Sequence, residues 1–243
     1  MIGLERPKMF VVSPTRLCLY GALVCLMLMP RVALAQQPAR SFAELQSREL
    51  VQTEDFAVKA SVFIGTSLDG FIARVNGDLD FLPPGGGEPH GYDEFMATVD
   101  ALVIGRKTYE TVLTFDTWPY GEKPVFVLST RTLAHAPLGA VVERMSGDPA
   151  EIGLQLDARG IRHVYVDGGI TIQRFLQAGL IQRLIITRIP VLIGTGIPLF
   201  GALQRDIVVR HVATRQYASG LVQSEYVPPN TPLQPSSSTG TSG

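Results

Sequence analysis

Thiols are scarce in this sequence of 243 residues, which holds only two cysteines, Cys18 and Cys25. Both lie in one apolar run near the N-terminus, so the rest of the chain has no thiol to form a disulfide, bind a metal or attack a substrate. The sequence also lacks a His/Cys cluster with the spacing of zinc ligands. We therefore expect no disulfide scaffold, no metal site and no cysteine nucleophile.

An excess of charge of one sign is also missing. The chain has 21 Lys and Arg residues against 22 Asp and Glu residues, a formal net charge of −1. A nearly neutral chain lacks the basic surface that nucleic acids and anionic membranes attract. With 46% hydrophobic and 18% charged residues, the composition is that of one globular domain with appendages. We therefore expect neither a nucleic acid nor an anionic membrane as a partner.

The N-terminus lacks a hydrophobic run long enough to span a bilayer. A basic start precedes a short apolar run, residues 17–29, and an Ala-x-Ala site that ends at Ala35. These features are typical of a secretory signal peptide. We expect residues 1–35 to be a signal peptide, residues 36–55 to be a linker, and the protein to be exported to the periplasm. The alternative is that this segment is not translated and the protein is cytoplasmic.

Strand and helix patterns alternate through the predicted domain, residues 56–227. This order predicts an α/β fold with a mostly parallel central sheet, an antiparallel C-terminal edge and helices on both faces. The tail, residues 228–243, is rich in Pro, Ser, Thr and Gly and is expected to be disordered. Strands are expected near residues 58–64, 71–73, 100–104, 123–128, 140–143, 163–167, 183–187, 207–215 and 221–227, and helices near 92–99, 105–112, 148–159 and 170–180.

A strand, two glycines and a helix follow one another within residues 162–180. The glycines, Gly168 and Gly169, have no Cβ atoms, so the backbone can come within hydrogen-bonding distance of an anion. The free N–H groups and the positive dipole end of the next helix then face that anion. This pattern predicts a phosphate site, with the Thr171 hydroxyl as a further ligand. A tight turn without a ligand is the alternative, because the full dinucleotide motif is not present.

Two further strand ends carry groups that suit phosphate. Residues 105–108 place two cations and a hydroxyl at a helix N-terminus, where cations oppose the helix dipole unless an anion binds. Residues 129–131 place hydroxyls beside a guanidinium, whose planar fork matches phosphate oxygens. A solvated basic turn and a plain surface turn are the alternatives. Because ligands of open α/β sheets bind at the carboxyl ends of the strands, we expect the three turns to hold a dinucleotide together.

The motifs of residues 56–226 resemble, in order, those of the dihydrofolate reductase fold. The resemblance is closer to the reductase domain of the riboflavin-pathway bifunctional deaminase-reductase. The matching motifs include Ser67-Leu-Asp-Gly70, Gly105-Arg-Lys-Thr-Tyr-Glu110, Val166-Asp-Gly-Gly169 and Pro190-Val-Leu-Ile-Gly-Thr-Gly196. The deaminase half has no counterpart here, because the zinc-ligand cluster is missing.

The resemblance implies NADPH as the cofactor and assigns the three turns. Arg106 and Arg131, with Ser129, would hold the adenosine 2′-phosphate. The residues that would lie along the pyrophosphate are Lys107, Thr108, Gly168, Gly169, Ile170 and Thr171. The full set of expected cofactor-binding positions adds Gly105 and Thr130 to these.

The resemblance also assigns the substrate side. The loop 67–70 would cover the nicotinamide and the substrate through Ser67 and Asp69, with Thr195 on the opposite lip. Hydride transfer to a C=N or C=O carbon needs a proton source, and Asp69 is the candidate catalytic residue. Its alternative role is a turn aspartate that binds its own backbone. The lesser candidates, Glu88, His90 and Asp93, are more simply read as solvated side chains.

Two departures from the relatives bear on the substrate. Glu122 lies where dihydrofolate reductases carry an arginine for the folate tail and would repel that carboxylate. Gln182 and Arg183 replace an acidic pair of riboflavin-type relatives. The leading hypothesis is a reductase most like 5-amino-6-(5-phosphoribosylamino)uracil reductase. The alternatives are an exported nucleotide-binding protein without turnover and a dihydrofolate or pteridine reductase. Relatives also suggest a homodimer.

Overall fold

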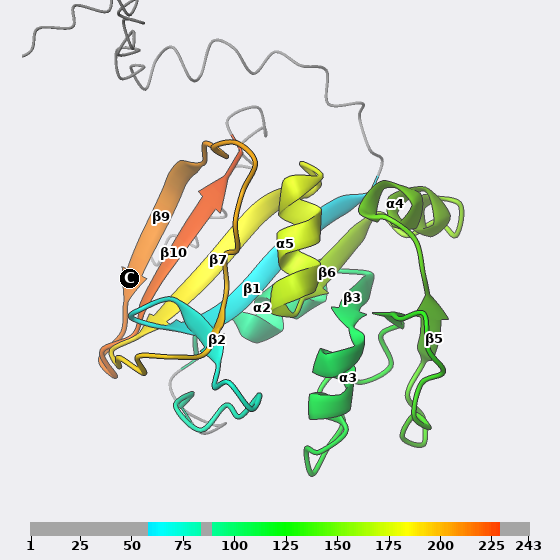
Figure 1. Ribbon diagram of the computed structural model, residues 1–243, viewed down its shortest axis with the longest axis horizontal. Helices are drawn as coiled ribbons and strands as arrows, with labels where there is room; N and C mark the ends of the chain where they lie inside the picture. Colours follow the sequence, from blue (N-terminus) through cyan, green and yellow to red (C-terminus); the bar gives the residue numbers. More distant parts are fainter. Residues whose placement is uncertain (1–57, 84–88, 229–243) are drawn as a thin grey trace, which may run out of the picture. The chain divides into compact units, whose positions relative to one another are not determined.

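The protein is described by a computed structural model for residues 58–83 and 89–228. Its main sheet has eight strands in the order β5-β4-β3-β6-β1-β7-β10-β9 (Figure 1). Along the chain the strands are β1 (Lys59–Ser67), β3 (Ala101–Gly105), β4 (Val125–Leu128), β5 (Val142–Met145), β6 (His163–Asp167), β7 (Ile181–Ile189), β9 (Arg210–Gln216) and β10 (Val222–Val227). Neighbours from β5 to β7 pair in parallel, whereas β10 pairs antiparallel to β7 and to β9. The predicted fold class is confirmed.

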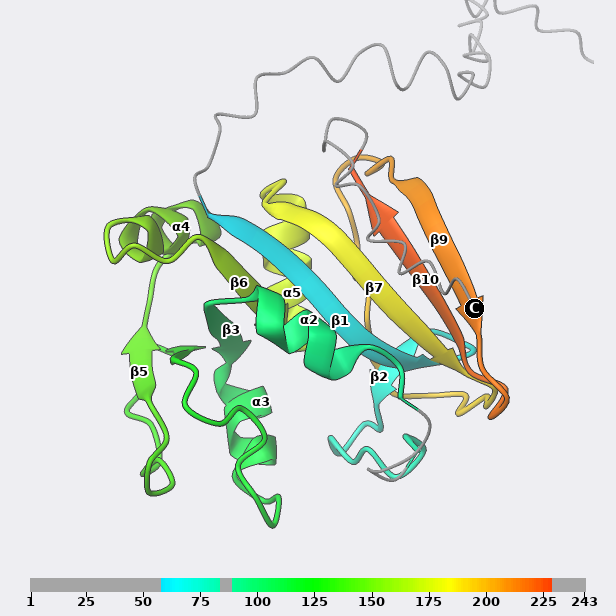
Figure 2. The ribbon, with the colours of Figure 1, turned by 180° about the vertical axis from the view of Figure 1, so that it is seen from behind.

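Helices cover both faces of the sheet. Helices α4 (Pro149–Asp157) and α5 (Gly169–Gln177) lie on the face seen in Figure 1, and α2 (Tyr92–Thr98) lies on the opposite face, seen in Figure 2. Helix α3 (Arg106–Val112) packs on the α2 side, because its buried residues share one core cluster with those of α2. Helices α4 and α5 contribute to a second cluster on the other side. The sheet is therefore the middle layer of three.

A small second sheet lies beside the main one. It pairs β2 (Phe71–Ala73) with β8 (Ile197–Pro198) in antiparallel fashion. Strand β2 agrees with the sequence prediction, whereas β8 falls in a segment that was expected to be loop. A two-residue strand that contains proline has no sequence periodicity, and only its pairing with β2 defines it.

Strand boundaries differ from the prediction where pairing overrides the local pattern. Strand β1 continues past Ile64, through Gly65, to Ser67, because Gly65 pairs with Thr187 and Ser67 with Ile189 on β7. The expected end of this strand at residue 64 is therefore wrong. Strand β5 begins two residues later than the expected residue 140, since its four residues pair with all four of β4.

The sequence explains the best-defined helix start. Asp148 accepts the N–H of Glu151 at 2.9 Å, and the Glu151 carboxylate accepts the N–H of Asp148 at 3.1 Å. This reciprocal capping box, with Pro149 at the first helical position, satisfies N–H groups that the helix itself leaves free. The start of helix α4 at Pro149 is thereby stabilised.

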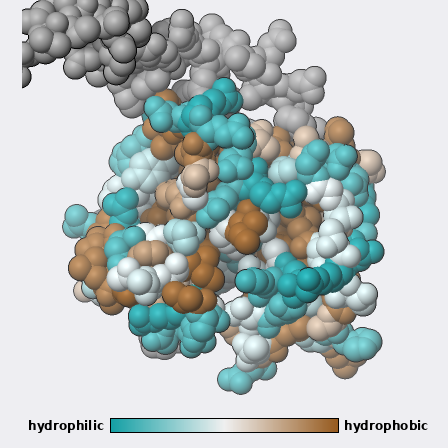
Figure 3. Space-filling view, viewed as in Figure 1, coloured by the Kyte–Doolittle hydropathy of each residue, from teal (hydrophilic) through white to brown (hydrophobic). Residues whose placement is uncertain are grey.

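Some of the sequence predictions lie outside the described residues. They are the signal peptide 1–35, the linker 36–55, nearly all of the tail 228–243, and Glu88. Within residues 58–83 and 89–228, no helix has the length and apolar content to cross a membrane. Figure 3 shows hydrophilic and hydrophobic residues intermixed on the side that carries α4 and α5.

Candidate functional site

The three predicted phosphate-binding turns lie at one edge of the sheet. Strands β4, β3 and β6 are adjacent and parallel, with Leu128 opposite Gly105 and Ile104 opposite Asp167. Their carboxyl ends therefore stop at the same level. The turns that follow, at residues 105–108, 129–131 and 168–171, meet there as the sequence predicted.

The first and third turns are interlocked. Gly168 has φ 91° and packs against the Thr108 hydroxyl so closely that a Cβ atom has no room. In return, a Cβ on Gly105 would lie 3.0 Å from the Thr171 hydroxyl, and Thr171 is buried. Each threonine thus fills the space that the other turn's glycine leaves. Gly168 is required by its φ angle and by this packing even before a ligand is considered, whereas a Cβ on Gly105 would need only a small shift of Thr171.

The interlocked turns still present donors that suit a pyrophosphate. The first intrahelical bond at this end of α5 runs from the N–H of Ile172 to the carbonyl oxygen of Gly168. The N–H groups of Gly169, Ile170 and Thr171 precede that bond and have no acceptor within the helix. Ile170 is exposed at this point. The chemistry of this edge fits a doubly negative phosphate group.

The second turn is closed by its own serine. The Ser129 hydroxyl accepts the N–H of Arg131 at 3.0 Å and lies 2.9 Å from the Arg131 carbonyl oxygen, to which it donates. Arg106 on α3 is paired with Glu110 one turn later. Of the cations predicted for the 2′-phosphate, Arg106 is thus already paired, and the Ser129 hydroxyl is engaged within the turn.

Hydrogen bonds of the Asp69 carboxylate connect the loop 67–70 to the loop 191–195, an arrangement that we call the Asp69 clasp. Its carboxylate accepts the Ser67 hydroxyl at 2.6 Å, the N–H of Gly194 at 2.7 Å and the N–H of Ile193 at 3.2 Å. The hydrogen bond from Ser67, aided by the two amides, lowers the pKa of this exposed group. A carboxyl group held in its ionised form is a poor proton donor. The geometry favours a structural role for Asp69, with partners across the loops as well as at Ser67.

The Asp69 clasp holds together the two loops, 67–70 and 191–195, that were expected to flank the substrate. Leu68 donates its N–H to Val191, and the side chains of Leu68 and Leu192 are exposed by 57% and 69%. Thr195 is exposed on the same segment as Leu192. These two loops therefore present apolar surface and one hydroxyl group to a ligand.

A carboxyl group that the sequence analysis did not single out is the most perturbed of the site. Asp167 ends β6 directly before Gly168, and its Oδ1 accepts the Gly168 N–H at 2.7 Å. Burial raises its pKa to about 6. The sequence did carry a signal for Asp167, which is an acidic residue directly before a predicted phosphate-binding glycine. Alternation along the strand also places it on the same face as Tyr165.

Aromatic rings surround this carboxyl group on the α2 and α3 face. Burial raises the pKa of Tyr92, Tyr120 and Tyr165, and the negative charge of Asp167 adds to each shift. Tyr120 packs edge-on against Trp118, at 5.1 Å between ring centroids. The Trp118 indole nitrogen is buried and has no hydrogen-bond partner among the described residues. These rings are part of the buried core cluster on this face of the sheet, so they give Asp167 an apolar environment.

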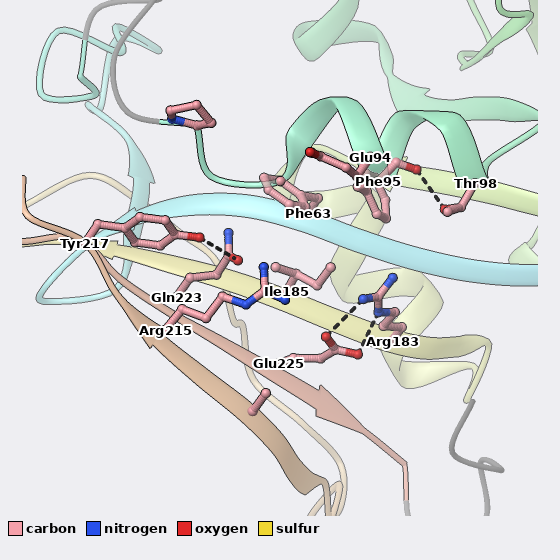
Figure 4. Close-up of a pocket in the computed structure, with 13 residues that line it drawn as sticks. Phe63, Glu94, Phe95, Thr98, Arg183, Ile185, Arg215, Tyr217, Gln223 and Glu225 are labelled. Atoms are coloured by element: carbon pink, nitrogen blue, oxygen red, sulfur yellow. Dashed lines mark hydrogen bonds and ion pairs between the residues drawn. The ribbon is translucent and has the colours of Figure 1, made fainter. Parts of the chain in front are cut away.

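A separate groove of about 530 Å³ lies between α2 and the strands β7, β9 and β10 (Figure 4). Glu94 and Thr98 of α2 line one wall, and strands β7, β9 and β10 line the other. Arg183 forms a two-pronged ion pair with Glu225 there, at 2.7 and 2.9 Å. None of the predicted site residues lines this groove. The positive charge of Arg183, a residue that differs from the relatives, is thus balanced by Glu225 of the same chain.

The lesser candidates do not join the site. His90 packs its ring against Phe63, with 5.7 Å between centroids, and its carbonyl oxygen accepts a hydrogen bond from Gln223. Asp93 is exposed in the first turn of α2. Within the described part of the chain, no group of His, Cys, Asp and Glu side chains has the arrangement of a metal site.

Comparison with known families decides the identity. The family model described as the RibD C-terminal domain matches residues 59–223. The chain belongs to this family. A putative riboflavin biosynthesis protein from Shewanella sp. PV-4 is 41% identical with a TM-score of 0.64, over 70% of this chain and 99% of that one. The expected resemblance is thereby confirmed.

More distant structures share the fold of this RibD C-terminal domain protein. One is a deaminase and 5-amino-6-(5-phosphoribosylamino)uracil reductase from Thermotoga maritima, with 17% identity and a TM-score of 0.55 over 71% of this chain and 57% of that one. The other is dihydrofolate reductase from Enterococcus faecalis in complex with NADP(H), with 18% identity and a TM-score of 0.50 over 71% and 97%. At these identities they show the dihydrofolate reductase-like fold alone.

Proposed function

We propose that this RibD C-terminal domain protein is an NADPH-dependent reductase of a small heterocycle, of the class of 5-amino-6-(5-phosphoribosylamino)uracil. The observation that carries the proposal is the convergence of three phosphate-suited turns with a half-buried carboxyl group, that of Asp167, at one edge of the sheet. The names of the relatives from Shewanella and Thermotoga support the riboflavin-type substrate class.

The residues at this edge fit the cofactor. The N–H groups of Gly169 and Ile170, with Lys107 and Thr108 across the interlocked turns, would hold the pyrophosphate. Arg131, beside the Ser129 turn, would face the 2′-phosphate. When bound, NADPH supplies a hydride to an electrophilic carbon. The protein's part is to orient the reactants and to provide the proton.

Asp167 is the proposed proton donor. With a pKa of about 6, a useful fraction of its carboxyl groups is protonated near neutral pH. As the substrate carbon accepts the hydride, the former C=N nitrogen or C=O oxygen takes the proton from Asp167. Water then reprotonates the carboxylate. The site of proton donation thus moves from Asp69, where the sequence analysis put it, to Asp167.

Binding and turnover test this proposal separately. NADPH at millimolar concentration should raise the melting temperature, and the nicotinamide absorbance should fall when an aminouracil ribotide is added. Asp167→Asn is the matched control, expected to keep the shift and lose the turnover. If wild-type protein shows no thermal shift with NADPH, the reductase proposal is wrong.

A second candidate function is an exported nucleotide-binding protein of the same fold without turnover. The signal-peptide pattern of residues 1–35 favours it, because an exported protein meets little reduced nicotinamide. NADPH binding without consumption across pterins, pyrimidines and quinazolines would support it. Mass spectrometry of the native N-terminus tests its premise, since Gln36 is the expected first residue after export. The homodimer stays a prediction.

A further inference from the structure

We propose that Arg144, on the edge strand β5, is a specificity-determining residue that binds the 2′-phosphate of NADPH together with Arg131. The inference rests on the proposed function and adds a residue that neither the sequence motifs nor the resemblance indicated. It concerns how the protein distinguishes a phosphorylated from an unphosphorylated adenosine ribose.

The backbone holds Arg144 against the second turn. Strand β5 pairs in parallel with β4, and the N–H of Ser129 donates to the carbonyl oxygen of Met145 at 2.9 Å. The Arg144 guanidinium donates back across this junction, from Nη1 to the carbonyl oxygen of Ser129 at 3.3 Å. This hydrogen bond places the exposed guanidinium group of Arg144 beside the turn that carries Arg131.

Strand alternation decides which face Arg144 occupies. Met145 is buried in the core under α4 and α5, and Glu143 reaches Arg159, which stacks on Phe126 of that same core. Because successive side chains alternate, Arg144 points to the other face. That face also carries α3, whose first residue is Arg106.

The charges at this turn are not balanced by the protein. Among the described residues, neither Arg131 nor Arg144 takes part in an ion pair, whereas Arg106 is paired with Glu110 and Glu143 with Arg159. The Ser129 hydroxyl is engaged within its own turn. Two guanidinium groups therefore offer the free donors, and a dianionic phosphate is the ligand that such forks match.

The position fits the adenosine end of a dinucleotide. Strand β4 lies two strands from β6, at about 5 Å per strand spacing, so the Ser129 turn is about one nucleoside away from Gly168. A pyrophosphate at Gly168 thus leaves the ribose 2′-position near Arg131 and Arg144. NADH lacks the phosphate and would leave both guanidinium groups unpaired.

Calorimetric titration of folded Arg144→Gln tests the inference. We expect the variant to bind NADPH and adenosine 2′,5′-bisphosphate about tenfold more weakly, the size of a lost charge-assisted hydrogen bond. Binding of NADH and of adenosine 5′-monophosphate should stay within about twofold. Arg144→Lys should recover only part of the loss, because a point charge replaces a fork. Arg205→Gln, which removes an exposed arginine outside the three turns, should change none of these.

The outcomes separate the two proposals. Equal weakening of NADPH and NADH, or no change in either, would overturn the role of Arg144 and leave the reductase proposal intact. Failure of the wild-type protein to bind NADPH would overturn both. Inorganic phosphate forms a further arm, because binding as tight as that of adenosine 2′,5′-bisphosphate would identify a general anion site and refute the role in cofactor recognition.

Discussion

Replacing Asp167 by Asn tests the most perturbed carboxyl group of the site. Burial raises its pKa from 3.8 to about 6, so ionising it in the folded protein costs about 3 kcal/mol at about 1.36 kcal/mol per pKa unit. Between these two pKa values the folded state binds more protons than the unfolded state. The contribution of Asp167 to stability is therefore fully present below its unfolded pKa and is lost as the pH rises through about 6.

The Asp167→Asn variant has no ionisable side chain at this position, so this pH dependence is missing from it. The difference in unfolding free energy between Asp167→Asn and wild type should shift in favour of the variant by about 2 kcal/mol from about pH 4.5 to about pH 7.5. Urea unfolding at both pH values measures it. A shift below about 0.5 kcal/mol, the usual error of such extrapolations, would refute the argument that burial perturbs this carboxyl group.

Asp100→Asn is a control in which the pH dependence of the stability difference from wild type should have the opposite sign. The Asp100 carboxylate accepts the N–H groups of Arg162 and His163 at 2.8 and 2.9 Å. The hydrogen bond from Arg162, the larger effect, and that from His163 lower its pKa. The stability that Asp100 adds is present above its unfolded pKa and lost as the pH falls. Its Asn variant should thus lose more stability near neutral pH than in acid.

Turnover gives the second readout for Asp167. The Asn variant should lower kcat about 100-fold or more while leaving NADPH binding nearly unchanged, because general-acid catalysis typically contributes at least that factor. In the wild-type protein, kcat should decline as the pH rises above about 6, where Asp167 loses its proton. A pH-independent kcat in this range would exclude Asp167 as the donor.

Three other changes test the architecture of the site and of the sheet. Asp69→Ala should speed hydrogen exchange at the amides of residues 193–194 with little change in the global unfolding transition, and unchanged exchange would contradict the clasp. Gly168→Ala should cost about 2 kcal/mol or more in urea unfolding, because φ 91° and the Thr108 hydroxyl both oppose a Cβ; adding Thr108→Ala should recover part of the loss. Burial lowers the pKa of His163, so the stability that His163 contributes is present above its unfolded pKa of about 6.5 and is lost as the pH falls below it; the stability of the wild type relative to His163→Gln should therefore fall over that range in urea unfolding, because the contribution of Asp167 is common to both proteins.

The sequence predicted the order of elements because hydrophobic periodicity and glycine placement are local properties. The strand His163–Asp167 and the helix after Gly169 appear as expected. The two-residue strand β8 and the extension of β1 through Gly65 depend on pairing with distant residues, which no local pattern reports. Three converging turns were predictable for the same reason as the order, since adjacent parallel strands end at one edge.

Side-chain roles were less predictable than positions. Asp69 was identified by its motif, yet its carboxylate binds amides of a loop that lies about 125 residues further along the chain. Asp167 was overlooked because the adjacent glycines carry the recognisable motif. Arg144 has no motif at all, and only the pairing of β5 with β4 brings it to the Ser129 turn.

The interlocked turns change how the glycine motif supports a function. Gly168 is required because Thr108 packs against it, so a protein of this fold needs a glycine there whether or not it binds a nucleotide. The stronger support comes from groups that folding leaves uncompensated. Half-burial of Asp167 disfavours its ionised form, and among the described residues Arg131 and Arg144 lie at one turn without a carboxylate partner. Interactions in the part of the chain that the structure describes do not compensate these groups, whereas a phosphorylated cofactor and a proton-accepting substrate would.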